Sequence, residues 1–422
     1  MVKKYIAALL SFLLIISITL GCAKKGESTT ETKKEGKEIT LMIPDWGAPT
    51  ENMLKEFKDE TGISVKVLPT AWDDIKGKVS TAAAGKKAAA DVIEVDWSWT
   101  GEFQSAGWLE ELAVDDETKA DIPSLSYFVV NNKTYAMPYA NGVRLAYMNK
   151  EMMNQAGITE FPKTWKEFDA TMGAIKDKKI KEYPFLFPLY AEEKTTTSFM
   201  TLAFTRNNIF FNNDDTLNKE SVLDTFKFLK ENLDKGYIDP ASVSTPGLDT
   251  FKGIRNAQGA FLIGPTSYVT STNDPKVSKV VGQVLSIPIP GKDGEAKTTI
   301  TFTEAVGVST YSENKEAAKQ FVKWFSTKKT QRTLNKEINN TPTRTSVLEE
   351  MIADGTIKTP GSLISESKKV TTPFPNGVPK YYTKMSTEIF NIINQFGQGK
   401  LTPEQAADQM EQKVNSIVKE NK

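Results

Sequence analysis

The sequence predicts an α/β protein, in which helices pack on parallel strands, and three observations support this class. Short apolar runs alternate with segments of helical spacing through residues 39–95, and this alternation is typical of parallel sheets covered by helices. The chain continues for about 385 residues after its polar N-terminal tract, which is more than one core usually supports. No fixed-period repeat or low-complexity linker follows Glu38, so we expect two domains connected by more than one crossing.

The first element of the chain has the layout of a secretion signal. Lys3 and Lys4 precede an uncharged apolar stretch, residues 6–20. A basic start, an apolar centre and a small residue at the cleavage point are typical of signal peptides. A membrane-spanning helix needs about 20 apolar residues, and this stretch is shorter. We therefore expect residues 1–21 to be a cleaved signal peptide.

Cys22 is the only cysteine of the chain, so it has no internal disulfide partner. Gly21 and Cys22 resemble the end of a bacterial lipobox, although Thr19 stands where leucine is usual. This resemblance implies that Cys22 becomes an acylated N-terminus anchored in the lipid bilayer. The tract that follows is too polar to fold. The sequence thus predicts a lipidated cysteine and flexible tether over residues 22–37.

Regular elements follow the tether in the order strand, helix, strand, helix, strand. An apolar run at 39–43 precedes a helical segment that ends at Gly62. Residues 63–67 alternate between apolar and polar, and a second helical segment leads to the apolar run 91–95. In such sheets, ligands bind beyond the carboxyl ends of the parallel strands. The residues that follow each apolar run are therefore candidates for a binding site.

Two of these strand ends carry the same dipeptide. Asp45 and Trp46 follow the first apolar run, and Asp96 and Trp97 follow the third, with Trp99 two residues further on. An indole can cover the apolar face of a pyranose while a carboxylate accepts from its hydroxyls. Core packing is the alternative for each tryptophan. Their position at the binding edge of the sheet favours a site.

The composition excludes several kinds of protein. The chain has no histidine, its net charge is zero, and its only cysteine is the one expected to be acylated. Histidine-dependent triads and cysteine-rich zinc sites are thereby excluded, and we expect no metal, no cofactor and no nucleic-acid partner. Hydrolysis by carboxylates alone stays open, because glycosidases use two acids. Asp45, Asp96, Glu192 and Glu304 are candidates for such a pair.

Long segments distributed along the whole mature chain resemble one known family. They include FKDETGISVKV (57–67), ADVIEVDWSWTGEFQSAGWLEEL (90–112), YAMPYANGVRLAYMNKEMMNQAGITEFPKTWKEF (135–168), GAFLIGPTS (259–267), NKEAAKQFVKWFSTKKTQ (314–331), NNTPTRTSV (339–347) and PFPNGVPKYYTKMSTEIFNIINQFGQGKLTPEQAADQM (373–410). In this order they resemble the sugar-binding lipoproteins of bacterial ABC importers, relatives of maltose-binding protein. Agreement over such a length is more specific than any single motif.

The resemblance implies an α/β, two-lobed periplasmic-binding-protein fold with hinge strands and an interlobe cleft. Residues 139–150 and 301–310 would form two of the crossings. The N-terminal lobe would comprise residues 38–145 plus 305–346, and the C-terminal lobe 146–304 plus 347–422. The sequence at the chain end agrees, because Thr402, Pro403 and Gln405 form a helix-capping pattern before an apolar stripe.

The resemblance also implies which residues line the cleft. Thr266 stands where relatives place an aromatic after Gly-Pro, so stacking there would pass to Tyr268 or Tyr381. Arg144 is equally compatible with a structural salt bridge. The full expected set is Asp45, Trp46, Asp96, Trp97, Trp99, Asn141, Arg144, Tyr190, Glu192, Gly264, Thr266, Tyr268, Glu304, Asn376 and Tyr381.

The function implied by the resemblance is binding without catalysis. The protein would be held at the outer face of the cell membrane by Cys22, capture a neutral sugar, in particular a short oligosaccharide, and deliver it to a membrane-embedded ABC permease. No bond would be broken, so the protein would not be an enzyme. The alternative is a surface carbohydrate-active hydrolase that uses paired carboxylates.

Overall fold

A computed structural model describes residues 37–357, 362–374 and 377–421 of the chain. The predicted signal peptide, Cys22 and nearly all of the predicted tether lie outside these residues, as does Asn376. Within the described ranges no helix combines the length and apolar character needed to cross a membrane.

The predicted alternation of strands and helices at the start of the folded chain is confirmed. Strand β1 (Glu38–Ile43) lies between β2 (Ser64–Pro69) and β3 (Val92–Asp96) and pairs with both in parallel. Helices α1 (Glu51–Thr61) and α2 (Trp72–Ala84) connect them. The carboxyl ends of β1 and β3 therefore lie at the same edge of the sheet, as the sequence predicted.

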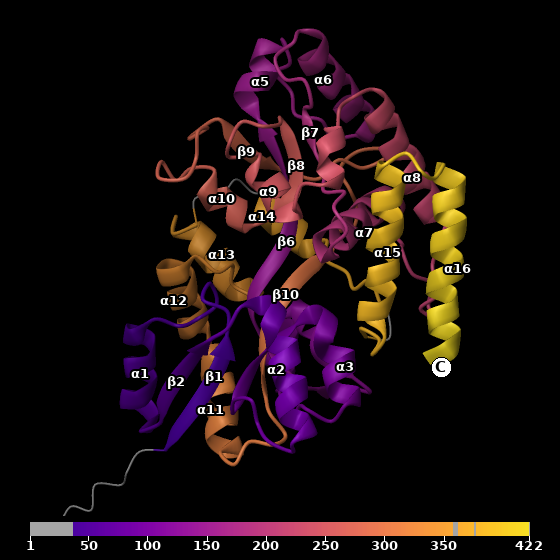
Figure 1. The fold of residues 1–422 in the computed structure, drawn as a ribbon. Helices are drawn as coiled ribbons and strands as arrows, with labels where there is room; N and C mark the ends of the chain where they lie inside the picture. The colour runs from indigo at the N-terminus through magenta and orange to yellow at the C-terminus, as the bar shows by residue number, and fades with distance from the viewer. Residues whose placement is uncertain (1–36, 358–361, 375–376, 422) are drawn as a thin grey trace, which may run out of the picture. The chain divides into compact units, whose positions relative to one another are not determined.

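One long strand belongs to two sheets (Figure 1). The first half of β6 (Met137–Asn149) pairs with β10 (Thr301–Val308), which in turn pairs with β3. The second half of β6 lies between β8 (Phe261–Pro265) and β9 (Val284–Ile287). We call β1, β2, β3, β10 and the first half of β6 the N-terminal sheet. The second half of β6 with β7 (Phe185–Leu186), β8 and β9 is the C-terminal sheet.

A glycine allows the strands of this junction to approach closely. Gly142 lies opposite Phe302 in the β6–β10 pairing, and a Cβ atom at this position would overlap the Phe302 carbonyl oxygen. Any other residue would push the two strands apart. The region where β6 passes from one sheet to the other therefore depends on residue 142.

The remaining elements cover the two sheets. Those of the first part of the chain and the returning segment are α3 (Thr100–Ser105), α4 (Asp116–Asp121), β4 (Val129–Val130), β5 (Lys133–Thr134), α11 (Lys315–Phe325), α12 (Lys328–Ile338) and α13 (Thr345–Ala353). Those of the middle are α5 (Lys150–Gln155), α6 (Trp165–Asp177), α7 (Glu193–Asn207), α8 (Lys219–Asp234), α9 (Gly247–Lys252), α10 (Ser267–Ser271) and α14 (Ser362–Lys368). Three short 3-10 turns are η1 (Trp97–Trp99), η2 (Pro123–Phe128) and η3 (Pro240–Val243).

The chain ends in two helices packed side by side, α15 (Tyr382–Gly397) and α16 (Pro403–Asn421) (Figure 1). The predicted capping pattern is confirmed, because the backbone N–H of Gln405 donates to the Thr402 hydroxyl at 3.2 Å and Gln405 Oε1 accepts from the Thr402 N–H at 3.0 Å. Helix α15 also contacts η1, at the carboxyl end of β3. The last part of the chain is thus brought against the predicted binding edge.

The exact lobe boundaries expected from the sequence stay a prediction.

Candidate functional site

Asp96 closes strand β3 and caps the turn that follows it. Its Oδ1 accepts from the Ser98 N–H at 2.8 Å and from the Ser98 hydroxyl. The side chain is buried. The predicted aspartate therefore stands at the strand end as expected, with one of its oxygens occupied by its own turn.

Three carboxyl groups gather at this strand end, those of Glu94 and Asp96 buried and that of Glu304 half-buried. Glu304 of β10 lies opposite Asp96 in the register, and Glu94 lies two residues before Asp96. The Tyr139 hydroxyl donates to Glu94 at 3.0 Å. Burial raises the pKa of all three carboxyl groups above their ordinary values, and the charges of Asp96 and Glu94 raise that of Glu304 further. We call Glu94, Asp96 and Glu304 the carboxyl cluster.

The three carboxyl groups lie close enough to hydrogen-bond to one another, Glu304 with both Glu94 and Asp96. Glu94 Oε1 and Glu304 Oε2 accept from no N–H or hydroxyl donor of the described residues, so a proton held between carboxyl groups is the partner available to them. A carboxyl group whose pKa is raised can donate as well as accept, which suits hydroxyl groups.

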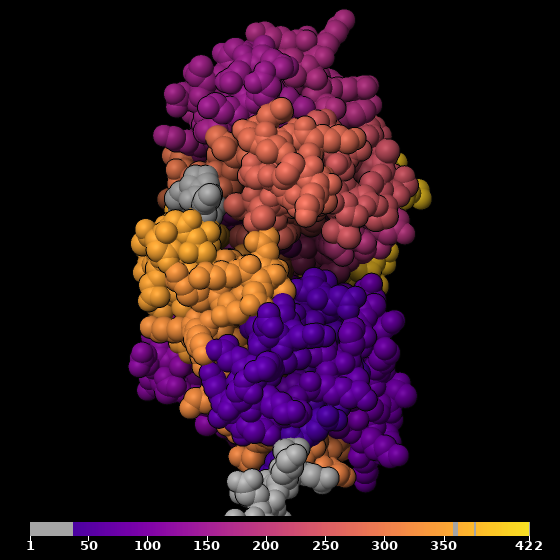
Figure 2. All heavy atoms as spheres, turned by 90° about the vertical axis from the view of Figure 1, so that its left-hand side faces the viewer, coloured from indigo at the N-terminus to yellow at the C-terminus, as the bar shows by residue number. Residues whose placement is uncertain are grey.

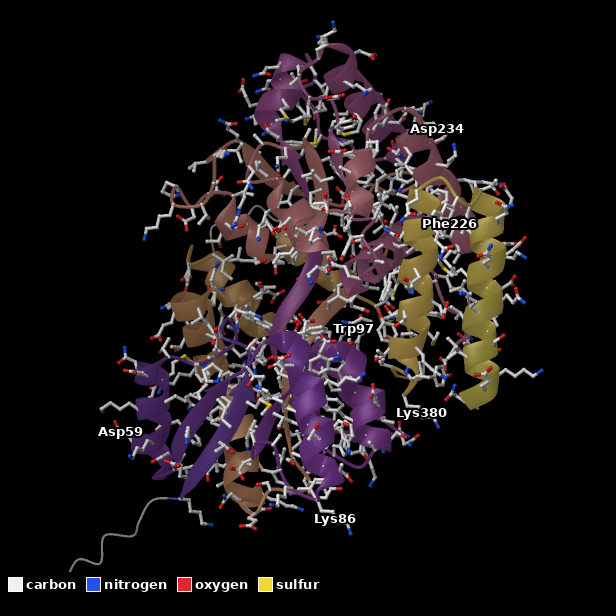
Figure 3. The ribbon with its side chains drawn as sticks, viewed as in Figure 1. Asp59, Lys86, Trp97, Phe226, Asp234 and Lys380 are labelled. Atoms are coloured by element: carbon white, nitrogen blue, oxygen red, sulfur yellow. The ribbon has the colours of Figure 1, made fainter. Side chains whose placement is uncertain are left out.

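Trp97 and Trp99 lie in the core. Trp97 is 2% exposed, and its ring contacts Tyr127, Phe302 and Tyr382, with centroids 6.0, 5.2 and 4.9 Å away. In Figure 3 it lies near the centre of the view, whereas Asp59 and Lys86 lie at the periphery. Trp99 is 4% exposed and is covered by other aromatic rings. Core packing, the alternative that the sequence left open, is the environment that the structure gives both residues.

The loop after β1 is exposed instead. Asp45 and Trp46 both face solvent, and Trp46 is 47% exposed. The next residue, Gly47, lies so close to the Tyr139 hydroxyl that a Cβ atom there would overlap it. Because Tyr139 donates to Glu94, the backbone of this loop lies close to the Glu94 end of the carboxyl cluster. The exposed indole therefore belongs to a loop that lies next to the cluster.

Asn141 and Thr266 join the two sheets through hydrogen bonds. The Thr266 hydroxyl donates to the Asn141 carbonyl at 3.2 Å and accepts from the Thr341 hydroxyl at 2.8 Å. The Asn141 amide accepts from the Thr303 hydroxyl at 3.0 Å and donates to the Pro342 carbonyl at 3.4 Å. These contacts satisfy both side chains within the protein. They support a role in fixing the junction of β6, β8 and β10.

Arg144 and Tyr268 line a pocket of about 370 Å³. Arg144 lies opposite Pro265 in the β6–β8 pairing, and Pro265 also lines the pocket. Gly264 lies opposite Leu145, one position before Pro265. Lys194 also lines this pocket. Burial raises the pKa of Asp96, and the positive charge of Lys194 acts in the opposite direction. The pocket and the carboxyl cluster therefore lie close enough to influence each other electrostatically.

The structure shows no contact of Tyr190, Glu192 or Tyr381 with the carboxyl cluster among the described residues. Tyr190 is 39% exposed, and Glu192 accepts from the Gly247 N–H at 2.6 Å, which fixes the start of α9. Tyr381 is buried and donates to Asp215 at 2.9 Å. The structure thus gives Glu192 and Tyr381 partners within the protein.

Sequence reasoning missed three charged residues near the site. Glu94 is a charge inside the apolar run DVIEV, which is an unusual place for a glutamate. Glu193 accepts from the Tyr382 hydroxyl at 2.6 Å and the Ser386 hydroxyl at 2.5 Å, and burial raises its pKa to about 7. Lys194 directly follows it. No motif marks Glu193 or Lys194, because their neighbours come from distant parts of the chain.

The surface beside the site is hollowed (Figure 2). A recess separates the salmon-coloured surface of the C-terminal sheet region from the orange and indigo surfaces below it. On this side a pocket of about 690 Å³ lies between α10 and α12, with Thr266 and Thr341 in its lining. The polar junction of the two sheets is therefore reached from the surface.

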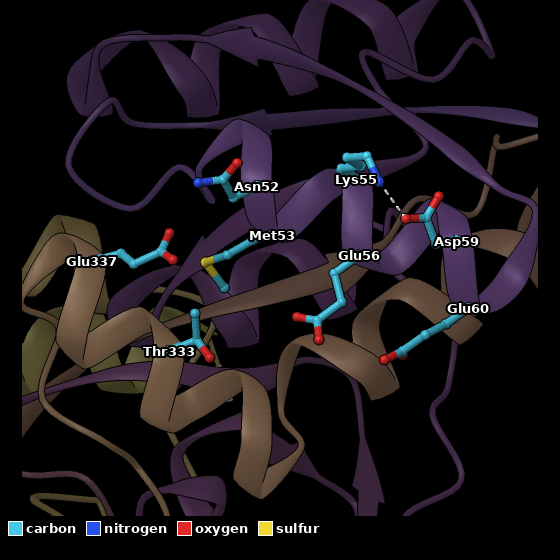
Figure 4. Close-up of a pocket in the computed structure, with 8 residues that line it drawn as sticks. All are labelled: Asn52, Met53, Lys55, Glu56, Asp59, Glu60, Thr333 and Glu337. Carbon is cyan, nitrogen blue, oxygen red and sulfur yellow. Dashed lines mark hydrogen bonds and ion pairs between the residues drawn. The ribbon is translucent and has the colours of Figure 1, made fainter.

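A second groove, between α1 and α12, has an acidic lining (Figure 4). Its charges are used within the protein: Lys55 pairs with Asp59 at 2.6 Å, and Lys329 pairs with Glu56 and Glu60. These side chains are largely exposed. Exposed ion pairs of this kind are ordinary surface features, so the groove carries no site.

Comparison with known proteins agrees with this arrangement. Residues 43–332 match the family described as bacterial extracellular solute-binding protein. A protein of Brucella abortus (strain 2308) named as a binding protein is 26% identical over 331 residues, which are 75% of this chain and 76% of that protein. The galactooligosaccharide-binding protein of Bacillus subtilis (strain 168) is 19% identical over 421 residues, 97% of this chain and 96% of the relative.

A solved structure shows the same fold. Maltose-bound MalE3 of T. maritima superposes with a TM-score of 0.76 at 19% identity, covering 90% of this chain and 99% of that chain. The predicted two-lobed fold is thereby confirmed. The family assignment favours solute binding and gives no support to the hydrolase alternative. The chain belongs to the bacterial extracellular solute-binding proteins.

Proposed function

We propose that the protein captures a sugar, in particular a short oligosaccharide, and delivers it to the permease of an ABC importer. The observation that carries this proposal is the exposed indole of Trp46 in the loop after β1, the strand that pairs with β3, at whose end the carboxyl cluster lies. An aromatic face and nearby acceptors for hydroxyl groups are the two elements that a pyranose requires. The galactooligosaccharide-binding relative and the maltose-bound neighbour support the same ligand class.

The proposal includes a membrane anchor and a moving cleft. Acylated Cys22 and the tether 22–37 would hold the protein at the outer face of the cell membrane. Residues 38–145 plus 305–346 and residues 146–304 plus 347–422 would form the lobes that close on the ligand. Closure would make the two lobe surfaces available together to the permease.

Calorimetry on the protein with malto-, xylo- and gluco-oligosaccharides tests sugar capture. We expect saturable binding of at least one sugar without formation of new reducing ends. Small-angle scattering should show a smaller radius of gyration at saturation. Release of reducing ends would support the hydrolase, and binding with an unchanged radius would contradict lobe closure.

Replacing Cys22 by Ala tests the anchor separately. Because Cys22 is the chain's only cysteine, the variant should lose stable lipid attachment and appear in the soluble fraction of the cells. If the variant is still recovered in the membrane by a detergent-sensitive attachment, the lipoprotein assignment is wrong.

A further inference from the structure

The arginines of the chain fall into two groups. Arg206, Arg332 and Arg344 each form an ion pair, with Asp224, Asp354 and Asp121 respectively. Arg144 and Arg255 form no ion pair among the described residues, and both line the pocket of about 370 Å³. The unpaired arginines are therefore concentrated at one place.

Arg144 is a buried cation without a counter-ion. It is 7% exposed, and it makes no side-chain hydrogen bond or ion pair with any described residue. The Phe302 ring lies 4.4 Å from its guanidinium carbon, and the Phe251 ring 6.0 Å. Such cation–π contacts offset only part of the unfavourable free energy of removing the guanidinium charge from water. Burial lowers the pKa of Arg144 to about 10, so the group is still charged at neutral pH.

Further positive charge surrounds Arg144. Lys194 and Arg255 line the same pocket, and Arg255 Nε is buried without a partner among the described residues. Lys252, also in the lining, is paired with Asp249 at 2.9 Å. Within the described part of the chain, no aspartate or glutamate lines the pocket. Lys194 acts electrostatically on Asp96 and Glu193, and burial raises the pKa of both. The Glu192 carboxylate also lies near Lys194, where it accepts from the Gly247 N–H.

The pocket also offers neutral donors. Ser267 and Tyr268 line it, and burial raises the pKa of Tyr268 to about 12, so this hydroxyl stays protonated at neutral pH. An arginine fork with adjacent hydroxyl and ammonium donors matches the oxygens of a carboxylate or a phosphate. A volume of about 370 Å³ lies in the range of small-molecule sites.

We propose that the sugar bound by this protein is acidic, and that Arg144, Lys194 and Arg255 bind its oxyanion. This inference rests on the proposed function. It differs from the expectation from the sequence in one respect, because the ligand would be a negatively charged sugar instead of a neutral one. The oxyanion would be the carboxylate of a uronic acid or the phosphate of a sugar phosphate. The adjacent carboxyl cluster and Trp46 would take the uncharged part of the ligand.

The test compares matched ligands on the full chain by calorimetry. The probes are di- and trigalacturonate, the corresponding neutral galactose oligosaccharides, and galactose phosphate. We expect an acidic probe to bind at least about tenfold more tightly than its neutral counterpart, because hydrogen bonds to a charged group are stronger than those between neutral groups. Preference for the galacturonates or for the phosphate identifies the source of the oxyanion.

Two variants and a control locate the binding. Arg255→Gln, at a half-buried position, should weaken binding of the acidic probe about tenfold or more and leave the neutral one unchanged. Arg144→Gln should do the same, and a thermal melt shows whether it folds. Arg332→Gln removes an arginine outside the pocket and should have no effect on affinity.

Three results would overturn the inference. Neutral probes could bind as tightly as acidic ones, Arg255→Gln could leave the affinity of the acidic probe unchanged, or Arg332→Gln could weaken it as much as Arg255→Gln does. In each of these cases sugar binding itself would still stand, and with it the proposed function. Failure of every sugar, acidic or neutral, to bind would contradict both proposals.

Discussion

The same dipeptide, Asp-Trp, follows two neighbouring parallel strands and has opposite surroundings at the two places. After β1, Asp45 and Trp46 face solvent, and Trp46 is 47% exposed. After β3, Asp96 and Trp97 are buried, and Trp97 is 2% exposed. The strands pair directly, so their position in the sheet does not explain the difference.

The difference comes from what covers each strand end. Trp97 is covered by Phe302 of β10 and by Tyr382 at the start of α15, which lie more than 200 residues further along the chain. The Trp46 indole contacts no other aromatic ring of the described residues, and its loop packs on Tyr139 through Gly47. A tryptophan at a strand end is therefore a candidate for ligand contact only where no later segment packs on it.

Replacing Trp97 by Ala should have the largest effect, on stability. Removing an indole packed among three rings should lower the free energy of unfolding by about 3–5 kcal/mol. Thermal and denaturant unfolding measure this loss. A variant that unfolds like the wild-type protein but binds sugar poorly would place Trp97 in the site.

Replacing Trp46 by Ala should have the reverse effect. Stability should change by no more than about 0.5 kcal/mol, because the side chain is largely exposed. The affinity for sugar should fall by roughly 2 kcal/mol, about thirtyfold, if the indole stacks on a ring as aromatic anchors do. Normal affinity in this variant, measured by calorimetry, would remove Trp46 from the site.

Replacing Gly47 by Ala tests how the exposed loop is held. The added methyl group would overlap the Tyr139 hydroxyl and should cost about 1–3 kcal/mol of stability. Removing that hydroxyl in Gly47→Ala/Tyr139→Phe should recover part of the loss. If the loop moves away from Tyr139 when the methyl group is added, the double variant should regain none of the stability lost in Gly47→Ala.

The smallest effect concerns the pH dependence of stability at the buried strand end. Burial raises the pKa of Glu94, Asp96 and Glu304. The ordinary pKa of glutamate is 4.5, and burial raises that of Glu94 to about 8. Between these two pH values the folded protein therefore holds more protons than the unfolded chain. The contribution of these groups to stability is complete below that window and is lost as the pH rises through it.

Glu304→Gln isolates this contribution, because the amide cannot ionise. Between about pH 5 and about pH 8, the melting temperature of this variant should fall less than that of the wild-type protein. Asp91, Asp121 and Asp224 have lowered pKa values and act in the opposite direction in both proteins. Glu316→Gln, at an exposed position, is the control and should follow the wild-type curve. Parallel curves for all three proteins would contradict the assignment.

Local features of the fold were predictable because they depend on nearby residues. The period of apolar residues gave β1, α1 and β2, and the capping pattern at Thr402 gave the start of α16. The alternation also indicated which ends of β1 and β3 lie together, since the carboxyl ends of parallel strands meet at one edge. The position of Asp45 and Asp96 at that edge followed from the sequence alone.

Contacts between distant segments were decided only by the tertiary structure. The sequence could not show that Phe302 and Tyr382 would cover Trp97, that Glu192 would bind the start of α9, or that Arg144 would be buried without an acid. Exposure and charge pairing are properties of surfaces that meet after folding, and they depend on residues far apart in the chain. The sequence by itself therefore determined where the strands end, and the packing of later elements decided which of the residues there face a ligand.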